Sequence, residues 1–285
     1  MVPGRLGLWG TPMRLEVSTG DECRRQTLSI QLFGSLRVLR NGQSIDNRLG
    51  GKARHLLKIL AVNRSRRLPK ELLMEMIWPE RDPRAGVISL KVATHTLRTA
   101  LDPSDRSPGR WIVVENGTYR LNPDADIWID TENFLAHYKH GRSSLATGSR
   151  TAARIEFEKA EELYDGDYLE EDMYEDWTVV RREALRDLYL DLIAKLATLS
   201  MEEGAYRDAI RYCHKILLAD SCREDAYKML IQSHGALNQI ARAGSWYAVC
   251  RSTLQREIGG SPSPEILSAF EALFAPQPVR GAQLA

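Results

Sequence analysis

Residues 88–103 read ISLKVATHTLRTALDP and combine two helical faces of different chemistry. Apolar or small side chains recur near the spacing of one helical face, at Ile88, Leu90, Thr94, Leu97 and Leu101. Lys91, His95 and Arg98 fall together on a neighbouring face. The stretch therefore predicts a helix that packs on a core by one face and presents polar, partly basic side chains on another.

The sequence before this helix predicts a small sheet and two further helices. Polar and apolar residues alternate in LSIQLFGSLRVLRNGQSID, and Asn41-Gly42 supplies a tight turn. We therefore expect a small antiparallel sheet over residues 28–48, with Ile45 starting its third run. Helical spacing follows in GKARHLLKILAVN. A second, short helix is expected over ELLMEMIW, which is bounded by prolines.

A hairpin signal follows the helix of residues 88–103. The segment WIVVENGTYRL contains two strand-like runs joined around Asn116-Gly117, and Asn-Gly is the strongest short hairpin signal. Three helices followed by a two-stranded hairpin are the elements of a winged helix-turn-helix.

The second half of the chain is helical almost throughout and contains an internal repeat. A set of apolar residues, Leu196, Ala209, Cys213 and Ile216, recurs 34 residues later as Leu230, Ala243, Tyr247 and Cys250. A period of 34 is that of a tetratricopeptide helix pair. We expect about three such pairs, with an extra segment around residues 165–190 between the first and the second. A plain helical bundle is the alternative.

These patterns divide the chain of 285 residues into four segments. We expect a disordered segment at residues 1–27, a winged-helix domain at 28–121, a tetratricopeptide-like helical domain at 122–276 and a tail at 277–285. The expected fold class is mostly α, with a small α+β domain preceding the helical repeats.

Charge separates the two expected domains, although the whole chain has a net charge of only +1. Residues 28–121 contain 17 Lys or Arg against 8 Asp or Glu, a net charge of +9. Residues 122–276 contain 17 against 27, a net charge of −10. Because polyanions are the natural ligands of a basic domain, this asymmetry favours a nucleic acid as the partner of the first domain.

The winged-helix pattern assigns roles to the basic residues. In a helix-turn-helix, the later helix enters the major groove of double-stranded DNA, so Lys91, His95 and Arg98 are predicted to read base edges. Predicted contacts to the DNA backbone are Lys52, Arg54, Arg84, Arg110, Thr118 and Arg120. Each of these six alone is compatible with a solvated surface residue; together they describe a basic surface.

Several other classes of protein are excluded. No apolar run approaches the roughly 20 residues of a membrane-spanning helix, and the first 27 residues lack the hydrophobic segment of a signal peptide. We therefore expect a cytoplasmic protein without a membrane partner. The four cysteines form no CxxC pair, which favours buried thiols over a zinc site or disulfides. Scattered histidines and the absence of GxSxG and HExxH predict no catalytic site, cofactor or metal.

The order of these segments resembles the Streptomyces antibiotic regulatory proteins. Their OmpR-like winged helix is similar to LSIQLFGSLRVLRNGQSI, GGKARHLLKILAVN, RRLPKELLMEMIWPE, ISLKVATHTLRTAL and the closing TYRL. Their bacterial transcriptional activator domain is similar to YDGDYLEEDMYEDW, VVRREALRDLYLDLIAKLA and LQREIGGSPSPEI. The resemblance covers residues 28–274 in the family's domain order.

The resemblance implies a sequence-specific transcriptional activator that binds promoter repeats through its winged helix. The helical domain would then contact RNA polymerase or a second copy of the chain, as in a homodimer. Relatives commonly carry more basic residues where this chain has His95-Thr96 and Arg98-Thr99, so no target sequence is carried over. The alternative is a protein-interaction scaffold whose helical repeats bind a partner while the winged helix serves only for docking.

An acidic segment at residues 165–176, with aromatic residues interleaved, keeps two interpretations open. It is either a surface that faces the polymerase or the other domain, or a solvated corner held by Tyr168, Tyr174 and Trp177. By charge alone, it would also dock on the basic winged helix and hold it off DNA.

Overall fold

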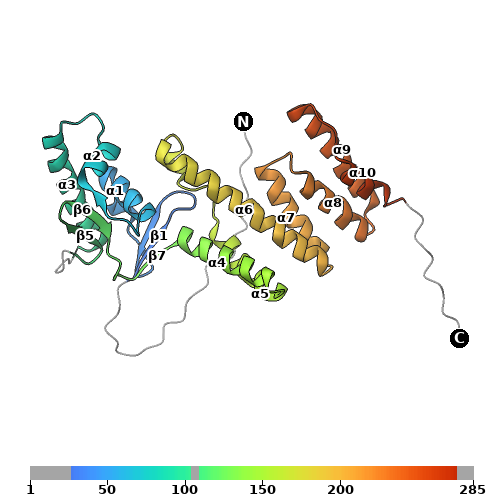
Figure 1. Ribbon diagram of the computed structural model, residues 1–285, viewed down its shortest axis with the longest axis horizontal. Helices are drawn as coiled ribbons and strands as arrows, with labels where there is room; N and C mark the ends of the chain where they lie inside the picture. Colours follow the sequence, from blue (N-terminus) through green and yellow to red (C-terminus); the bar gives the residue numbers. More distant parts are fainter. Residues whose placement is uncertain (1–26, 104–108, 275–285) are drawn as a thin grey trace.

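The computed structural model describes residues 27–103 and 109–274, which form an elongated molecule (Figure 1). A part that contains two sheets lies at one end, and a row of helices runs from it to the other end. The predictions for residues 1–26, including Cys23, and for the tail at 277–285 lie outside the described residues. Within the described ranges, no helix is both long and apolar enough to cross a membrane.

The first sheet has four strands in the order β3-β2-β1-β7. Strands β1 (Leu28–Gln31) and β2 (Arg37–Arg40) pair antiparallel, and β2 pairs with β3 (Gln43–Ser44) across the Asn41-Gly42 turn. Both turn residues have positive φ, as a two-residue hairpin turn requires. The predicted sheet is confirmed, except that Ile45 lies buried after the third strand. A fourth strand, β7 (Ile127–Ile129), joins β1 in parallel and was not predicted.

Three helices follow, as predicted: α1 (Gly51–Val62), α2 (Lys70–Ile77) and α3 (Pro83–Leu101). Asp82 caps α3, because its carboxylate accepts hydrogen bonds from the backbone N–H groups of Arg84 and Ala85. The predicted core face is confirmed for Leu90, Thr94, Leu97 and Leu101, which are buried. The prediction was wrong for Ile88, whose side chain is 65% exposed. Ile88 precedes Leu90 by two residues, which places it on the opposite side of a helix with 3.6 residues per turn.

The predicted wing is a hairpin of β5 (Ile112–Glu115) and β6 (Thr118–Leu121). Asn116 and Gly117 form its turn with positive φ. A short strand, β4 (Leu68–Pro69), completes a three-stranded sheet in the order β4-β6-β5. The backbone N–H of Lys70 donates to the Gly117 carbonyl over 2.9 Å, which ties the start of α2 to the wing.

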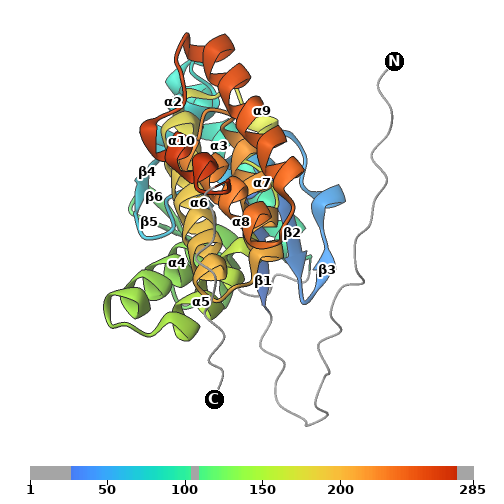
Figure 2. The ribbon, with the colours of Figure 1, turned by 90° about the vertical axis from the view of Figure 1, so that its right-hand side faces the viewer.

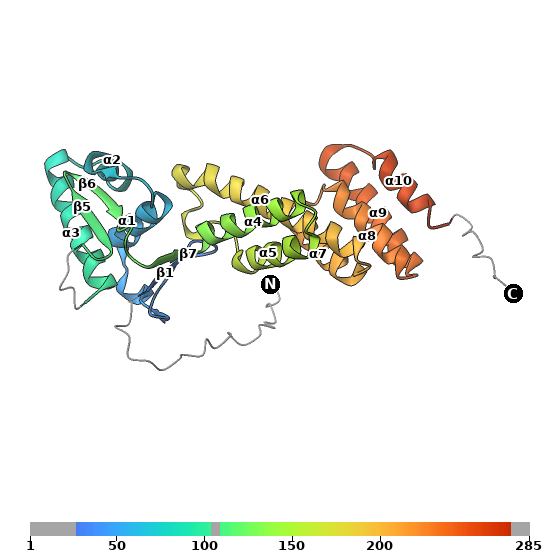
Figure 3. The same ribbon diagram turned by 60° about the horizontal axis from the view of Figure 1, so that its bottom comes forward.

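The helical half consists of three antiparallel helix pairs and a last helix (Figures 2 and 3). The pairs are α4 (Asp130–Ala146) with α5 (Arg150–Leu163), α6 (Asp176–Glu202) with α7 (Tyr206–Ala219), and α8 (Glu224–Ala236) with α9 (Ile240–Ile258), followed by α10 (Pro264–Glu271). The expected extra segment at residues 165–190 is a loop with the short helix η2 (Glu170–Asp172) and the first half of α6. Seen from the α10 end, the pairs lie in front of the winged helix (Figure 2).

The 34-residue repeat marks the contacts between these helix pairs. Seven of its eight residues are buried, and Tyr247 is half buried, its ring stacked on Phe270 with 4.4 Å between ring centres. Cys213 and Cys250 belong to this buried set, and burial raises the pKa of the Cys213 thiol to about 12 and that of Cys250 to about 11. For these two cysteines, the prediction of buried thiols is confirmed.

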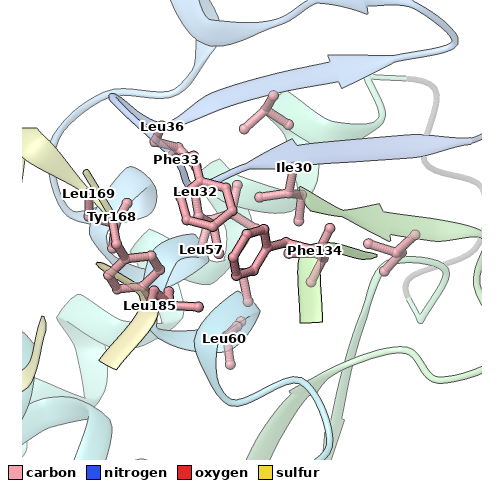
Figure 4. Packing of buried hydrophobic residues seen from close by; sticks show 14 of the residues in the cluster. Ile30, Leu32, Phe33, Leu36, Leu57, Leu60, Phe134, Tyr168, Leu169 and Leu185 are labelled. Atoms are coloured by element: carbon pink, nitrogen blue, oxygen red, sulfur yellow. The ribbon is translucent and has the colours of Figure 1, made fainter. Parts of the chain in front are cut away.

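One hydrophobic cluster passes from the first sheet into the helical half (Figure 4). Phe33 packs edge-on against Phe134 of α4, with 5.3 Å between ring centres, and forms a β-bridge with Tyr168. The Asp130 carboxylate accepts hydrogen bonds from the backbone N–H groups of Leu32 and Phe33 over 2.7 and 2.9 Å. The two parts are therefore joined by core packing, and the domain boundary at residues 121 and 122 stays a prediction.

Ion pairs between α1 and the acidic segment strengthen this joint, the contact region between the winged helix and the helical half. Lys58 of α1 is buried, and its ammonium group lies 2.8 Å from Glu171 and 2.6 Å from Asp172. Arg54 pairs with the same Glu171 carboxylate over 3.1 Å. Burial alone would raise the pKa of Glu171, but the hydrogen bond and charge of Lys58 together with the charge of Arg54 lower it. The acidic segment therefore docks on α1 of the winged helix and leaves the outer face of α3 exposed. That it holds the winged helix off DNA stays a prediction.

Candidate nucleic-acid interface

The outer face of α3 is the candidate interface. Its buried stripe lies at positions 90, 94, 97 and 101, and a second stripe with the same spacing lies opposite, at Ile88, Val92, His95 and Thr99. All four residues of this second stripe are exposed. None of the 19 residues of α3 is Asp or Glu, so the helix presents no negative side chain to a polyanion.

The structure separates the three predicted base readers. Lys91 and His95 are exposed, and their side chains form no hydrogen bond or ion pair with another described residue. Arg98 is half buried, and its Nη2 donates to the backbone carbonyl of Ile112 over 2.9 Å. Lys91 and His95 therefore lie together on the outer face, whereas Arg98 lies at its edge and links α3 to strand β5 of the wing.

The predicted backbone contacts fall in three places. Near α3, Arg84 is exposed in the first helical turn, and the Lys52 ammonium donates to the Ile77 carbonyl over 2.8 Å. In the wing, the Arg110 guanidinium lies 5.4 Å from the centre of the Trp111 ring. Arg54 lies apart from these residues, because Glu171 of the helical half holds it.

The wing also contains a carboxylate among its cations. The Glu115 carboxylate lies 3.3 Å from the guanidinium of Arg67 and 3.9 Å from that of Arg120. The hydroxyl of Thr118, across the turn, donates to the backbone carbonyl of Glu115 over 2.8 Å. Thr118 and Arg120 are therefore close to one another at the wing, with part of the positive charge balanced by Glu115.

Two apolar residues on the outer face were not predicted as part of the site. Ile88 is 65% exposed and Val92 is 60% exposed. With Thr96, they line a groove of about 340 Å³ between α3 and the start of α1, where Lys52 contributes a positive charge. The sequence contains a signal for this exposed stripe. Positions 88, 92, 95 and 99 have the same spacing as the buried positions 90, 94, 97 and 101 but lie two residues earlier, which places them on the opposite side of the helix.

Comparisons with known proteins agree with this architecture. A model of the bacterial transcriptional activator domain matches residues 129–274. The transcriptional regulatory protein MoaR1 of Mycobacterium tuberculosis is 22% identical over 228 residues, which are 80% of this chain and 73% of MoaR1. The matches confirm the predicted activator domain.

A solved structure extends the likeness to the winged helix. The structure of Mycobacterium tuberculosis EmbR in complex with a low-affinity phosphopeptide superposes with a TM-score of 0.73 at 22% sequence identity. The match covers 89% of this chain and 66% of the EmbR chain. The two proteins therefore share a fold over most of this chain, which confirms the predicted fold class.

Proposed function

We propose that this chain, which belongs to the family of the bacterial transcriptional activator domain, is a transcriptional activator. In this proposal it binds promoter DNA through its winged helix. The observation that carries this proposal is the outer face of α3, which is exposed, free of carboxylates and anchored by a buried stripe. A helix of this kind enters the major groove in helix-turn-helix proteins. A scaffold function without DNA binding is not favoured by the family match.

Within this proposal, the residues of the winged helix have different roles. Lys91 and His95 face base edges, because they lie on the outer face with free donor groups. Arg98 positions the wing through its bond to the Ile112 carbonyl. Contacts to phosphate come from Arg84 in the first turn of α3, from Lys52 of α1 beside it, and from the wing residues Arg110, Thr118 and Arg120. Arg54 belongs to the joint with the helical half.

The helical half supplies the activating contacts in this proposal. It carries the net charge of −10, and it is fixed to the winged helix by the shared core and by the pairs of Lys58. A partner that touches the helical half is thereby held at a defined distance from the bound promoter. We propose that RNA polymerase is this partner. We also propose that the helical half contacts a second copy of the chain bound to an adjacent promoter repeat, and that the protein acts in the cytoplasm.

Binding to DNA should depend steeply on salt. Duplexes that the full chain selects from a random-sequence library should bind about 1,000-fold more weakly at 200 mM than at 50 mM salt if six or more phosphates are contacted.

Lys91→Ala should weaken specific binding about 5- to 150-fold if the ammonium group donates to a base. Fluorescence anisotropy measures both effects. The control is Lys139→Ala, which removes an exposed lysine of α4 and should leave the Kd unchanged.

Two results would contradict this proposal. One is that no duplex is enriched from the library. The other is that Lys91→Ala and Lys139→Ala bind the enriched duplex equally well.

A further inference from the structure

We infer that Ile88 and Val92 read thymine, by packing against the methyl groups that thymine bases place in the major groove. This inference rests on the proposed function and deepens it, because it names the base that an unpredicted part of the interface selects. Its starting point is that the centre of the outer face of α3 is apolar, with side chains that are 65% and 60% exposed.

The geometry of α3 keeps these two side chains out of the hydrophobic core. They belong to the stripe opposite the buried residues of positions 90, 94, 97 and 101, so no rotamer brings them to the core. Scattered single apolar residues are normal on a surface. Ile88 and Val92, however, are four residues apart on one face and line one groove, which makes them a continuous ridge.

Charge around the ridge selects DNA as its occupant. Arg84 and Lys91 flank it on one side, Lys52 lines the groove on the other, and α3 has no carboxylate. The ridge also belongs to the half of the chain with a net charge of +9, which repels the winged helix of a second copy. An apolar surface with cations on both sides fits a partner that is negative outside and apolar at the point of contact.

The major groove offers such a point of contact at thymine. Thymine presents its C5 methyl group there, whereas none of the other three bases carries a methyl group. Isoleucine and valine are stiff at χ1 and hold their methyl groups in fixed directions. Four residues of helix rise by about 6 Å, close to two base-pair steps of about 3.4 Å each. Ile88 and Val92 therefore reach methyl groups on bases about two steps apart.

The test removes the methyl groups from the DNA and the ridge from the protein. The duplex that the full chain selects from a random-sequence library is made again with deoxyuridine at single thymine positions, which removes the methyl and retains the hydrogen-bonding groups. For the native chain, each contacted methyl removed should raise the Kd about fourfold. The double variant Ile88→Ala with Val92→Ala should bind the two duplexes equally well. Both residues are exposed, so the fold does not depend on them.

A matched control comes from the helical half. Leu218 of α7 is 88% exposed, and Leu218→Ala should retain the native preference for thymine over deoxyuridine. Sedimentation of each chain without DNA checks whether the ridge instead joins two copies.

The outcomes separate this inference from the proposed function. Failure to enrich any duplex overturns both. An enriched duplex whose Kd does not change with deoxyuridine overturns the thymine inference alone. The same holds if the double variant keeps the thymine preference, if Leu218→Ala loses it, or if the double variant dissociates a dimer that forms without DNA.

Discussion

Arg182→Ala is expected to lower the free energy of unfolding by about 3–5 kcal/mol. Arg182 lies on α6 and is only 7% exposed. Its guanidinium donates to the backbone carbonyls of Tyr168, Leu169 and Asp172 over 2.8, 3.1 and 3.1 Å, and to the Thr178 hydroxyl over 3.0 Å. Alanine would leave the buried Tyr168 carbonyl without a donor, which costs about 1–3 kcal/mol. The carbonyls of Leu169 and Asp172 would keep their bonds from backbone N–H groups, but each would lose a hydrogen bond from a charged donor, which contributes about 1.5–3 kcal/mol.

The loss would also weaken the joint between the two halves. The carbonyls that Arg182 holds belong to the segment whose carboxylates at Glu171 and Asp172 bind Lys58 of the winged helix. Urea unfolding of the native chain and of Arg182→Ala measures the difference in free energy. The control is Arg207→Ala, at an exposed arginine of α7, which should change stability by less than about 0.5 kcal/mol. Equal effects of the two substitutions would contradict the structural role of Arg182.

Asp130 is expected to make the free energy of unfolding decrease as the pH rises from about 4 to about 6. Its carboxylate is 3% exposed, and burial raises its pKa to about 6, although hydrogen bonds from the backbone N–H groups of Phe33, Leu32 and Thr131 oppose the shift. The native state therefore binds a proton more tightly than the unfolded chain does. Its contribution to stability is greatest below about pH 4, decreases as the pH rises to about 6, and is constant above that.

The comparison with Asp130→Asn isolates this contribution. Asparagine keeps one oxygen as acceptor but does not titrate, so the stability of the native chain relative to the variant should fall by about 2–3 kcal/mol between pH 4 and pH 7. Urea unfolding at a series of pH values gives this difference. A constant difference over that range, or one that grows with pH, would be incompatible with a buried carboxylate of raised pKa at the joint.

The parts of the fold that depend on local signals could be predicted from the sequence. Asn41-Gly42 and Asn116-Gly117 fix two hairpins, because both residues of each turn adopt positive φ. Asp82 begins α3 by capping it, and the 34-residue spacing gives the helix pairs of the second half. Each of these signals acts over a few residues or repeats at a fixed period.

What could not be predicted depends on residues far apart in the sequence. Strands β7 and β1 pair although most of the winged helix lies between them in the sequence. Neither segment therefore shows the pairing by itself. Arg54 was predicted to contact DNA, and nothing near it in the sequence reveals that Glu171 holds it. Arg98 is a residue type that commonly reads bases, but its guanidinium donates to the Ile112 carbonyl of the wing. Ile88 was assigned to the core because apolar residues usually lie there.

The most direct test of DNA recognition by α3 is a genome-wide binding map of the chain in its host cell. The map should show discrete sites upstream of genes that share one sequence, and these sites should be lost from a chain that carries Lys91→Ala together with Ile88→Ala. Lys139→Ala should retain them. A map without discrete sites, or sites that persist unchanged when the outer face of α3 is altered, would contradict recognition of DNA by this helix.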